Sequence, residues 1–238
     1  MEKSAKRYKS EKLLLAVDCI IFGFDNEGLK LLVIKRGFAP CKGRLSLMGG
    51  FVRDTESSED AAIRVLHELT GLKGIYMEQL HLFSQVDRDP GARTAVMAYF
   101  ALIDIERYQS QMSEAFKARW VGASEVPELI FDHNKMVEMA KERLRYKAAL
   151  HPLLFELLPE RFTIPQLQSL YEKLYDTKLD SGNFSKKIKS LGLLVQLKDR
   201  DKEHSKKGAY FYALNREKYE EGFSTFLNFV PKPKFKLG

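Results

Sequence analysis

The sequence is poor in the residues and segments that define several large classes of protein. It contains 2 cysteines among 238 residues, so neither a disulfide framework nor a cysteine-based metal site is expected. No stretch approaches the roughly 20 apolar residues that cross a bilayer. The first residues, MEKSAKRYKSEK, lack the apolar core of a signal peptide. We therefore expect a cytoplasmic protein with no membrane partner and no bound cofactor.

Length and charge favour two domains with different partners. An apolar share of 45% is enough for buried cores, and 238 residues exceed the usual size of one domain. Residues 1–150 hold 23 Lys and Arg against 21 Asp and Glu, whereas residues 151–238 hold 16 against 11. A basic second domain favours a polyanionic partner such as DNA, although a lysine-rich face that is merely solvated gives the same balance.

Carboxylates are also scarce in one segment that otherwise has the pattern of a nucleotide hydrolase. Residues 50–72 read GFVRDTESSEDAAIRVLHELTGL. This segment resembles the Nudix box, in which glutamates on a helix bind Mg²⁺ beside phosphates. Two of the core glutamates are replaced, by Val65 and Leu69. The positions that match the pattern are Gly50, Glu56, Arg64, Leu66, Glu68, Gly71 and Leu72.

The two replacements remove most of the expected metal-binding face. Positions 65, 68 and 69 share one side of a helix, because residues three and four apart are neighbours there. Only Glu68 carries a carboxylate on that side, and Val65 and Leu69 can simply widen an apolar stripe that packs on a sheet. We predict no metal site and no catalytic residue, with Glu56, Arg64 and Glu68 left from a degenerate box. Residual hydrolase activity is the alternative.

Strands and helices alternate through residues 1–150, as a Nudix fold requires. Ser57 with Asp60 predicts a capping box at the start of the box helix, and Gly71 predicts its end. A long helix is expected from Asp132 to near residue 150, before the expected domain boundary at His151-Pro152. The fold class is therefore α+β, a Nudix-fold α/β/α sandwich with a mixed sheet followed by a second domain. The expected strands are 13–24, 29–36, 45–52, 76–85, 94–105 and 117–121.

The second half, residues 151–238, has the element order of a winged helix-turn-helix domain. Thr163 with Pro165 predicts the start of one helix, and a second helix is expected over 180–191. Two strands, 194–197 and 209–214, flank the charged segment KDRDKEHSKKG. Helix, turn, helix and a hairpin with a basic tip are typical of this DNA-binding fold. A generic α+β module is the alternative.

The expected helix over 180–191 indicates which side chains would meet DNA. At 100° per residue, Phe184, Ile188 and Leu191 fall on one side and are expected to face the core. Polar and cationic residues elsewhere on the helix suit a major groove, with lysines on phosphates and polar side chains on bases. The predicted DNA-binding residues are Asn183, Ser185, Lys186, Lys187, Lys189 and Ser190 on the helix, and Lys202, Lys206 and Lys207 on the hairpin tip.

Over nearly its whole length the chain resembles the Nudix-related bacterial transcriptional regulators. The resemblance rests on VDCIIFGF, LSLMGGFV, the degenerate box, VDRDPGAR, the FDH before the long helix, and FTIPQLQSLYEKLY with NFSKKI. It implies a homodimer that binds a palindromic operator in double-stranded DNA. It also implies a small-molecule effector that the Nudix-like domain binds without hydrolysing it.

Two branches of this family differ in their effector, L-arabinose in one and ADP-ribose in the other. The segment Leu47-Met48-Gly49-Gly50 departs from the Leu-Pro-Gly-Gly of the ADP-ribose branch. With FGF after the first strand and the closing PKFKL, it resembles the arabinose-responsive branch. We therefore expect a sugar such as L-arabinose, with ADP-ribose and NAD metabolism as the alternative.

The resemblance places the effector beside the box helix and the facing strands. Asp18 interrupts an apolar strand, where it is either a core carboxylate satisfied by backbone donors or an acceptor for sugar hydroxyls. The loop VDRDPGAR is either a self-contained set of ion pairs or the polar wall of the pocket. The predicted effector-binding residues are Asp18, Lys35, Arg36, Gly49, Gly50, Asp87, Arg88, Asp89 and Arg93.

Three functions are compatible with these patterns. An effector-controlled DNA-binding regulator accounts for both the lost carboxylates and the basic helix with its hairpin. A working Nudix hydrolase of nucleoside diphosphate derivatives would use Glu56 and Glu68 with a metal. A binding module with no role on DNA is the third.

Overall fold

The structure, a computed structural model, describes residues 12–25, 28–112, 118–150, 153–201 and 208–222. The chain divides into two compact units, Met1–Arg143 and Leu144–Gly238. This division lies inside the long helix, whereas the sequence places the boundary at the end of that helix, at His151-Pro152. Within the described residues no helix is both long and apolar enough to span a membrane.

The first unit is built on a mixed sheet of seven strands in the order β3-β2-β1-β6-β5, with β4 also paired to β1 and β7 to β2. Strands β1 and β6 run parallel over eleven register pairs, and the other pairs are antiparallel. The sequence predicted six strands here, with ends that differ by a few residues, and its single strand 45–52 is divided in the structure into β3 and β4, which pair with β2 and β1 respectively. Their bounds are β1 Leu14–Asp25, β2 Gly28–Lys35, β3 Leu45–Ser46, β4 Met48–Phe51, β5 Glu78–Phe83, β6 Thr94–Asp104 and β7 Arg119–Gly122.

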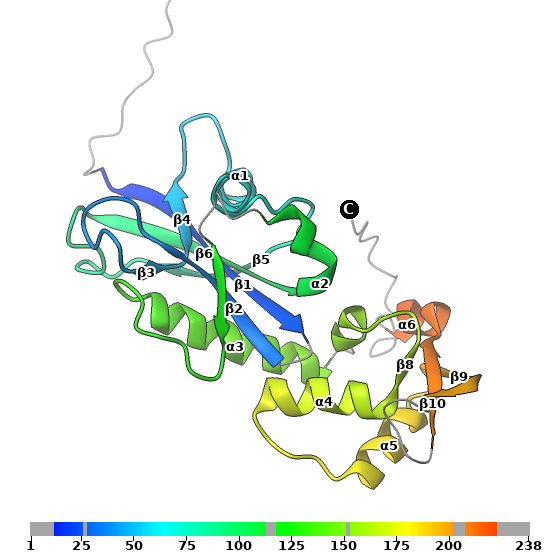
Figure 1. The fold of residues 1–238 in the computed structure, drawn as a ribbon. Helices are drawn as coiled ribbons and strands as arrows, with labels where there is room; N and C mark the ends of the chain where they lie inside the picture. The colour runs from blue at the N-terminus through cyan, green and yellow to red at the C-terminus, as the bar shows by residue number, and fades with distance from the viewer. Residues whose placement is uncertain (1–11, 26–27, 113–117, 151–152, 202–207, 223–238) are drawn as a thin grey trace, which may run out of the picture. The chain divides into compact units, whose positions relative to one another are not determined.

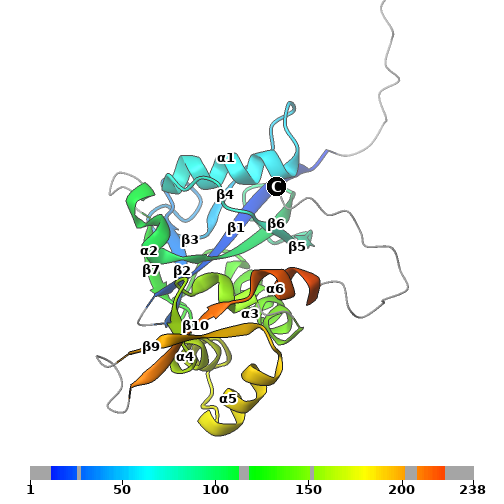
Figure 2. The same cartoon turned by 90° about the vertical axis from the view of Figure 1, so that its right-hand side faces the viewer.

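Helices cover both faces of this sheet, which confirms the predicted sandwich (Figures 1 and 2). Helix α1 (Ser58–Thr70) packs on one face, and α3 (His133–Leu150) lies on the other. Side chains alternate along β1, so Val17, Cys19 and Ile21 join the core under α1. Asp18 therefore points to the opposite face. A short helix α2 (Ile105–Tyr108) and a 3-10 turn η1 (Gln109–Gln111) follow β6.

The predicted ends of α1 are confirmed. The Ser57 side chain accepts a hydrogen bond from the backbone of Asp60, whose side chain accepts in turn from the backbone of Ser57. Gly71 ends the helix at φ 82°, a conformation that favours glycine. Val65 is 2% exposed, and a Cβ on Gly50 would lie 2.7 Å from its methyl group. Val65 therefore belongs to the apolar stripe of α1, as expected if its role is to pack against the sheet.

The second unit is a three-stranded sheet, β8-β10-β9, with three α-helices. Thr163 caps α4, as its position predicted, and it also forms a capping box with Gln166 that was not predicted from the sequence. The buried core includes Phe155, Phe162, Leu167 and Ile188. The element bounds are η3 Leu153–Leu157, β8 Phe162–Thr163, α4 Ile164–Tyr175, α5 Ser181–Ser190, β9 Leu194–Asp201, β10 Ala209–Leu214 and α6 Arg216–Gly222.

The predicted core face of α5 is correct for two residues and wrong for the third. Ile188 is buried and the partly buried Phe184 packs against the same cluster, but Leu191 is 46% exposed. Helix α5 ends at Ser190, so Leu191 is the capping residue, and Gly192 follows at φ 69°. The backbone of Leu191 is still right-handed helical, at φ −69° and ψ −20°, so its side chain keeps the phase of the helix, but it is not among the residues packed in the core cluster.

Candidate functional site

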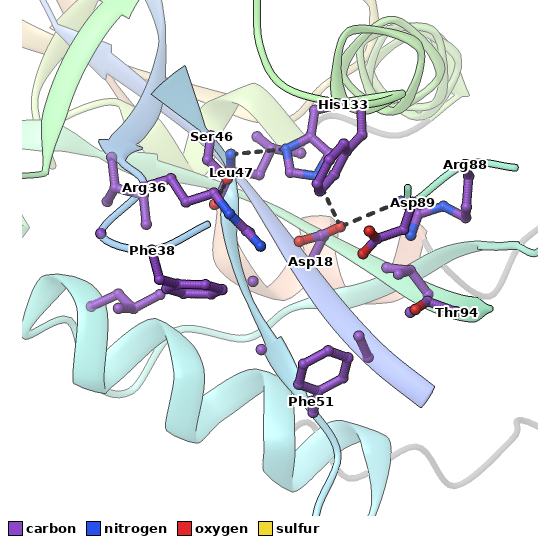
Figure 3. A pocket seen from close by; sticks show the side chains of 18 of the residues that line it. Asp18, Arg36, Phe38, Ser46, Leu47, Phe51, Arg88, Asp89, Thr94 and His133 are labelled. Carbon is purple, nitrogen blue, oxygen red and sulfur yellow. Dashed lines mark hydrogen bonds and ion pairs between the residues drawn. The ribbon is translucent and has the colours of Figure 1, made fainter. Parts of the chain in front are cut away.

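A cavity of about 310 Å³ opens on the face of β1 opposite α1 (Figure 3). That volume lies at the lower end of the roughly 300–1,000 Å³ typical of small-molecule pockets. Strands β1, β2 and β4, the loop before β6 and the start of α3 supply its walls. The lining residues with polar or aromatic side chains are Asp18, Lys35, Arg36, Phe38, Ser46, Phe51, Arg88, Asp89, Thr94, Phe131 and His133.

Asp18 lies at the centre of this cavity and is almost completely buried. It pairs with Gly49 across β1 and β4, and a Cβ on Gly49 would lie 2.2 Å from its Oδ1. Position 49 must therefore be glycine for the carboxyl group to occupy this place. Burial raises the pKa of Asp18 to about 7, although the nearby Arg88 guanidinium lowers it.

His133 contacts Asp18 in a defined tautomer. The backbone N–H of Leu47 donates to His133 Nδ1 over 3.2 Å, so the neutral ring carries its proton on Nε2. That Nε2 lies 3.4 Å from Asp18 Oδ2. Burial lowers the pKa of His133 to about 3, so the ring is neutral at physiological pH. His133 thus presents an N–H donor to the carboxyl group.

Arg88 is the buried cation of the site. Its Nε and Nη2 donate to the two carboxylate oxygens of Asp132 over 3.1 and 2.6 Å. Asp18 Oδ2 lies 3.9 Å from the same Nη2. The loop VDRDPGAR is therefore not a self-contained set of ion pairs, because its buried arginine binds a carboxylate just before α3. It forms part of the cavity wall.

Cations and aromatic rings gather at the β2 side of the cavity. The Arg36 guanidinium carbon lies 4.0 Å from the centre of the Phe38 ring and 5.4 Å from that of Phe131. Arg36 Nε donates to the carbonyl of Pro40 over 2.7 Å, which holds the side chain in place. Lys35 is exposed on the same rim. This side of the cavity therefore combines positive charge with flat aromatic surfaces.

The structure brings seven of the nine predicted effector-binding residues to the cavity: Asp18, Lys35, Arg36, Gly49, Gly50, Arg88 and Asp89. The other two, Asp87 and Arg93, are exposed and do not line it. Arg93 donates to the carbonyl of Gln85 instead. Sequence reasoning missed Phe38, Phe131, Asp132 and His133. The FDH motif marked three of these four positions, but it gave no indication of their contacts.

The carboxylates left in the degenerate box are bound to arginines. Arg64 donates to both oxygens of Glu56 and to Glu68, and Arg53 lies 3.5 Å from Glu68. The hydrogen bond from Arg64 lowers the pKa of Glu56 to about 2. Leu69 is half-buried and lines the cavity. Among the described residues, no three His, Cys, Asp or Glu side chains are grouped as ligands for a metal ion.

Helix α5 presents a polar face that differs in part from the predicted one. Asn183, Lys186, Lys187 and Ser190 are exposed. Ser185 is half-buried and lines a groove against α4. Lys189 is exposed, but its Nζ lies 5.8 Å from the centre of the Tyr212 ring, toward the core side. Lys202, Lys206, Lys207 and the closing PKFKL segment lie outside the described residues.

Comparison with known proteins identifies this combination of domains. The model of the NUDIX domain family matches residues 12–140, and that of the NrtR DNA-binding winged helix domain matches residues 154–214. A Nudix domain that binds an effector, joined to a winged helix, defines a class of DNA-binding transcriptional regulators. Within that class, the chain belongs to the NrtR family. The predicted fold class and regulator family are thereby confirmed.

Two relatives, one of them represented by two solved structures, are similar over most of the length compared. The chain is 32% identical to the ADPR responsive transcriptional repressor NtrR of Acinetobacter baylyi over 221 residues, 91% of this chain and 88% of the relative. Shewanella oneidensis NrtR, solved with a 27mer DNA, has a TM-score of 0.71 at 29% identity, covering 87% of this chain and 95% of that one. The NUDIX domain of that protein with ADP ribose has a TM-score of 0.52 at 30% identity, covering 60% and 99%.

Asp18 makes the stability of the folded chain depend on pH. Its pKa of about 7 lies above the roughly 3.9 of an exposed aspartate. The folded chain therefore holds a proton that the unfolded chain releases, so Asp18 stabilises the fold near pH 4, and this contribution is lost as the pH rises through 7. His133 acts in the opposite sense, because its lowered pKa removes stability as the pH falls from about 6.5 toward 3.

The substitution Asp18→Asn keeps the shape of the side chain and removes this titration. Relative to the wild type, the free energy of unfolding of the variant is expected to rise by about 2 kcal/mol between about pH 5 and about pH 8. Urea unfolding at the two pH values measures the difference, and His133 is common to both proteins. Asp87→Asn, on the exposed part of the loop, should follow the wild type. An Asp18→Asn variant that also follows it would contradict a proton bound at this site.

Proposed function

We propose that this chain is a DNA-binding regulator whose Nudix domain binds ADP-ribose without hydrolysing it. The observation that carries the proposal is the cavity itself, where a buried carboxyl group, three cationic side chains and aromatic rings line one space. The homodimer and the palindromic operator implied by the family resemblance belong to the same proposal. So does a cytoplasmic location.

The chemistry of ADP-ribose matches the parts of this cavity. Its diphosphate needs cations, which Lys35 and Arg36 offer on the rim. Its adenine needs a flat apolar surface, and Phe38 and Phe51 line the cavity while remaining largely exposed. Its ribose hydroxyls need acceptors and donors, which Asp18 and Ser46 offer inside. A pentose would use the inner polar groups alone and leave the cationic, aromatic rim without a partner.

The relatives favour ADP-ribose over the expected sugar. The Acinetobacter repressor is described as ADPR responsive, and the Shewanella NUDIX domain was solved with ADP ribose. The alternative expected from the sequence is therefore better supported than L-arabinose, which was the first expectation.

Binding without hydrolysis is supported by the residues of the box. Glu56 and Glu68 are occupied by arginine donors, so a cation would have to displace Arg64 and Arg53 to reach them. The position of a third carboxylate is taken by Val65, which packs against Gly50 in the core. The remaining one is Leu69, whose apolar side chain faces the cavity.

Binding to DNA is assigned to the exposed face of α5. Asn183, Lys186, Lys187 and Ser190 combine an amide, two ammonium groups and a hydroxyl on one accessible side. Lysines on such a face bind phosphates, and the amide can read a base edge. Ser185 is turned toward α4 and Lys189 toward Tyr212. We therefore assign these two residues a smaller contribution to DNA binding than was predicted from the sequence.

Removing the cation on the rim should weaken effector binding. Arg36→Ala is expected to lower the affinity for ADP-ribose about 10- to 100-fold, because a charge-assisted hydrogen bond to phosphate is lost. Isothermal calorimetry measures the affinity of each variant for ADP-ribose. The affinity of the wild type should also fall as salt is added, because salt screens the attraction between the diphosphate and the cations. Arg93→Ala is the matched control, because it removes the same charge from an exposed residue that does not line the cavity. Binding of L-arabinose in place of ADP-ribose would refute the choice of effector.

Hydrolysis should be absent or negligible. With Mg²⁺ or Mn²⁺, turnover of ADP-ribose followed by chromatography should lie far below the roughly 1 s⁻¹ of an ordinary enzyme. Leu69→Glu should fold, because the position is half-buried and faces the cavity. Val65→Glu should unfold more readily, since it buries a charge in the core. Ordinary turnover by the unmodified chain would show that the hydrolase alternative is correct.

The exposed face of α5 should carry affinity for DNA. Lys186→Ala should weaken binding to a duplex selected for tight binding, and reduce the slope of affinity against salt by about one ion. Asn183→Ala should reduce discrimination between duplexes of different sequence. Lys141→Ala removes the same charge from the first unit and serves as the control in fluorescence anisotropy. Unchanged affinity in both α5 variants would remove the assignment of this helix.

A further inference from the structure

The first residues at the start of α3 are bound to the cavity by three different contacts. The Phe131 ring lies 5.4 Å from the Arg36 guanidinium, and its backbone is left-handed, at φ 51°. Asp132 holds both donors of Arg88, and His133 links Leu47 to Asp18. A bulky side chain in that backbone region is strained, and such strain persists only where the surroundings enforce it.

The strongest of these contacts is buried and has a fixed geometry. The side chains of Arg88 and Asp132 are 2% and 12% exposed, so water does not screen their two parallel hydrogen bonds. The bidentate pair fixes the position of Asp132, and with it the start of α3, relative to the cavity wall. Loss of the pair would remove that constraint, so it is a point at which a ligand could act on α3.

The other end of α3 is bound in the second unit. Arg145 Nε donates to the carbonyl of Leu174 over 2.9 Å, and Tyr175 Oη donates to the carbonyl of Arg145 over 2.6 Å. Both partners lie in the last turn of α4. Helix α4 is followed directly by α5, whose start Asp180 caps. Helix α3 thus lines the effector cavity with His133, in its first turn, and bonds to α4 through Arg145, nearer its C-terminal end.

We propose that α3 couples the two activities, with the Arg88–Asp132 pair as the contact that the effector changes. This inference rests on the proposed function. Besides Lys35 and Arg36 on the rim, Arg88 is the third cation that lines the cavity, so the negative charge of bound ADP-ribose attracts its guanidinium and competes with Asp132 for it. Release of Asp132 changes the strained start of α3, and the Arg145 contacts carry that change to α4. Asp132 and Phe131 are positioning residues in this scheme, since they act on DNA binding through α3.

The coupling is measured as the ratio of the affinities for DNA with and without saturating ADP-ribose. The probe is a duplex selected for tight binding to the wild-type chain, and the readout is fluorescence anisotropy. For the wild type we expect a ratio within the roughly 5- to 150-fold range of allosteric systems. For Asp132→Asn, which keeps the shape and weakens the grip on Arg88, we expect a ratio within about twofold of one. Because the effector is saturating, a change in its own affinity does not enter the ratio.

Two further variants make the result specific. Glu128→Gln changes an acid to its amide in the segment before α3, where the acid pairs with Arg44 at an exposed position, and should keep the wild-type ratio. Phe131→Gly relieves the left-handed strain and removes the ring that contacts Arg36 and His133, and should also lower the ratio. Thermal unfolding checks that each variant is folded.

The outcomes separate this inference from the proposed function. Wild-type ratios in both Asp132→Asn and Phe131→Gly would overturn the role of α3. A wild-type chain that binds ADP-ribose with no change in DNA affinity would also overturn it, and would leave the effector proposal standing. A wild-type chain that binds no ADP-ribose would overturn both. By reciprocity, the affinity for ADP-ribose measured with and without the duplex must give the same ratio.

Discussion

A carboxyl group buried at the centre of the sheet is the constraint on which the rest of the site depends. Asp18 interrupts a strand whose neighbours on both sides are fully buried, and such a group is costly unless polar partners surround it. Three segments supply what it needs: Gly49 the space, His133 a neutral N–H donor, and Arg88 a positive charge. Arg88 in turn requires Asp132 to balance its own burial. The polar half of the cavity therefore follows from one residue.

Two adjacent glycines in β4 separate this site from the former box. Side chains alternate along a strand, so Gly49 faces Asp18 while Gly50 faces Val65 on α1. On one side the missing Cβ admits a carboxyl group, and on the other it admits a valine methyl. A glutamate at position 65 would place a charge where Val65 now packs, in the core of the first unit. The absence of a carboxylate at position 65 therefore goes together with the close packing of α1 on β4.

Local patterns predicted what local interactions determine. The capping box at Ser57, the N-cap at Thr163 and the end of α1 at Gly71 depend on residues within a few positions, and each was predicted correctly. Periodicity placed Leu191 with Phe184 and Ile188, but the core cluster does not include this position at the end of α5, and a helical period cannot register how far the core extends. The contact from Leu47 to His133 spans 86 residues. The sequence showed that Asp18 is unusual, because it is a carboxylate within an apolar strand. Its partners depend on the register of the strands and on the residue at which α3 begins, and a single sequence specifies neither.

The same reasoning shows that the segment Leu47-Met48-Gly49-Gly50 is a weak guide to the effector. Met48 was the departure that favoured arabinose. In the structure Met48 is fully buried and packs with Val17, Cys19 and the apolar side of α1, and it is not among the residues that line the cavity. Its neighbour Gly49 is the residue that faces the ligand side, through Asp18. The identity of residue 48 is therefore set by packing under α1. In the proposed function, discrimination between a sugar and a nucleotide is assigned instead to Arg36, Phe38 and Phe51, which line the cavity with a charge and aromatic surface.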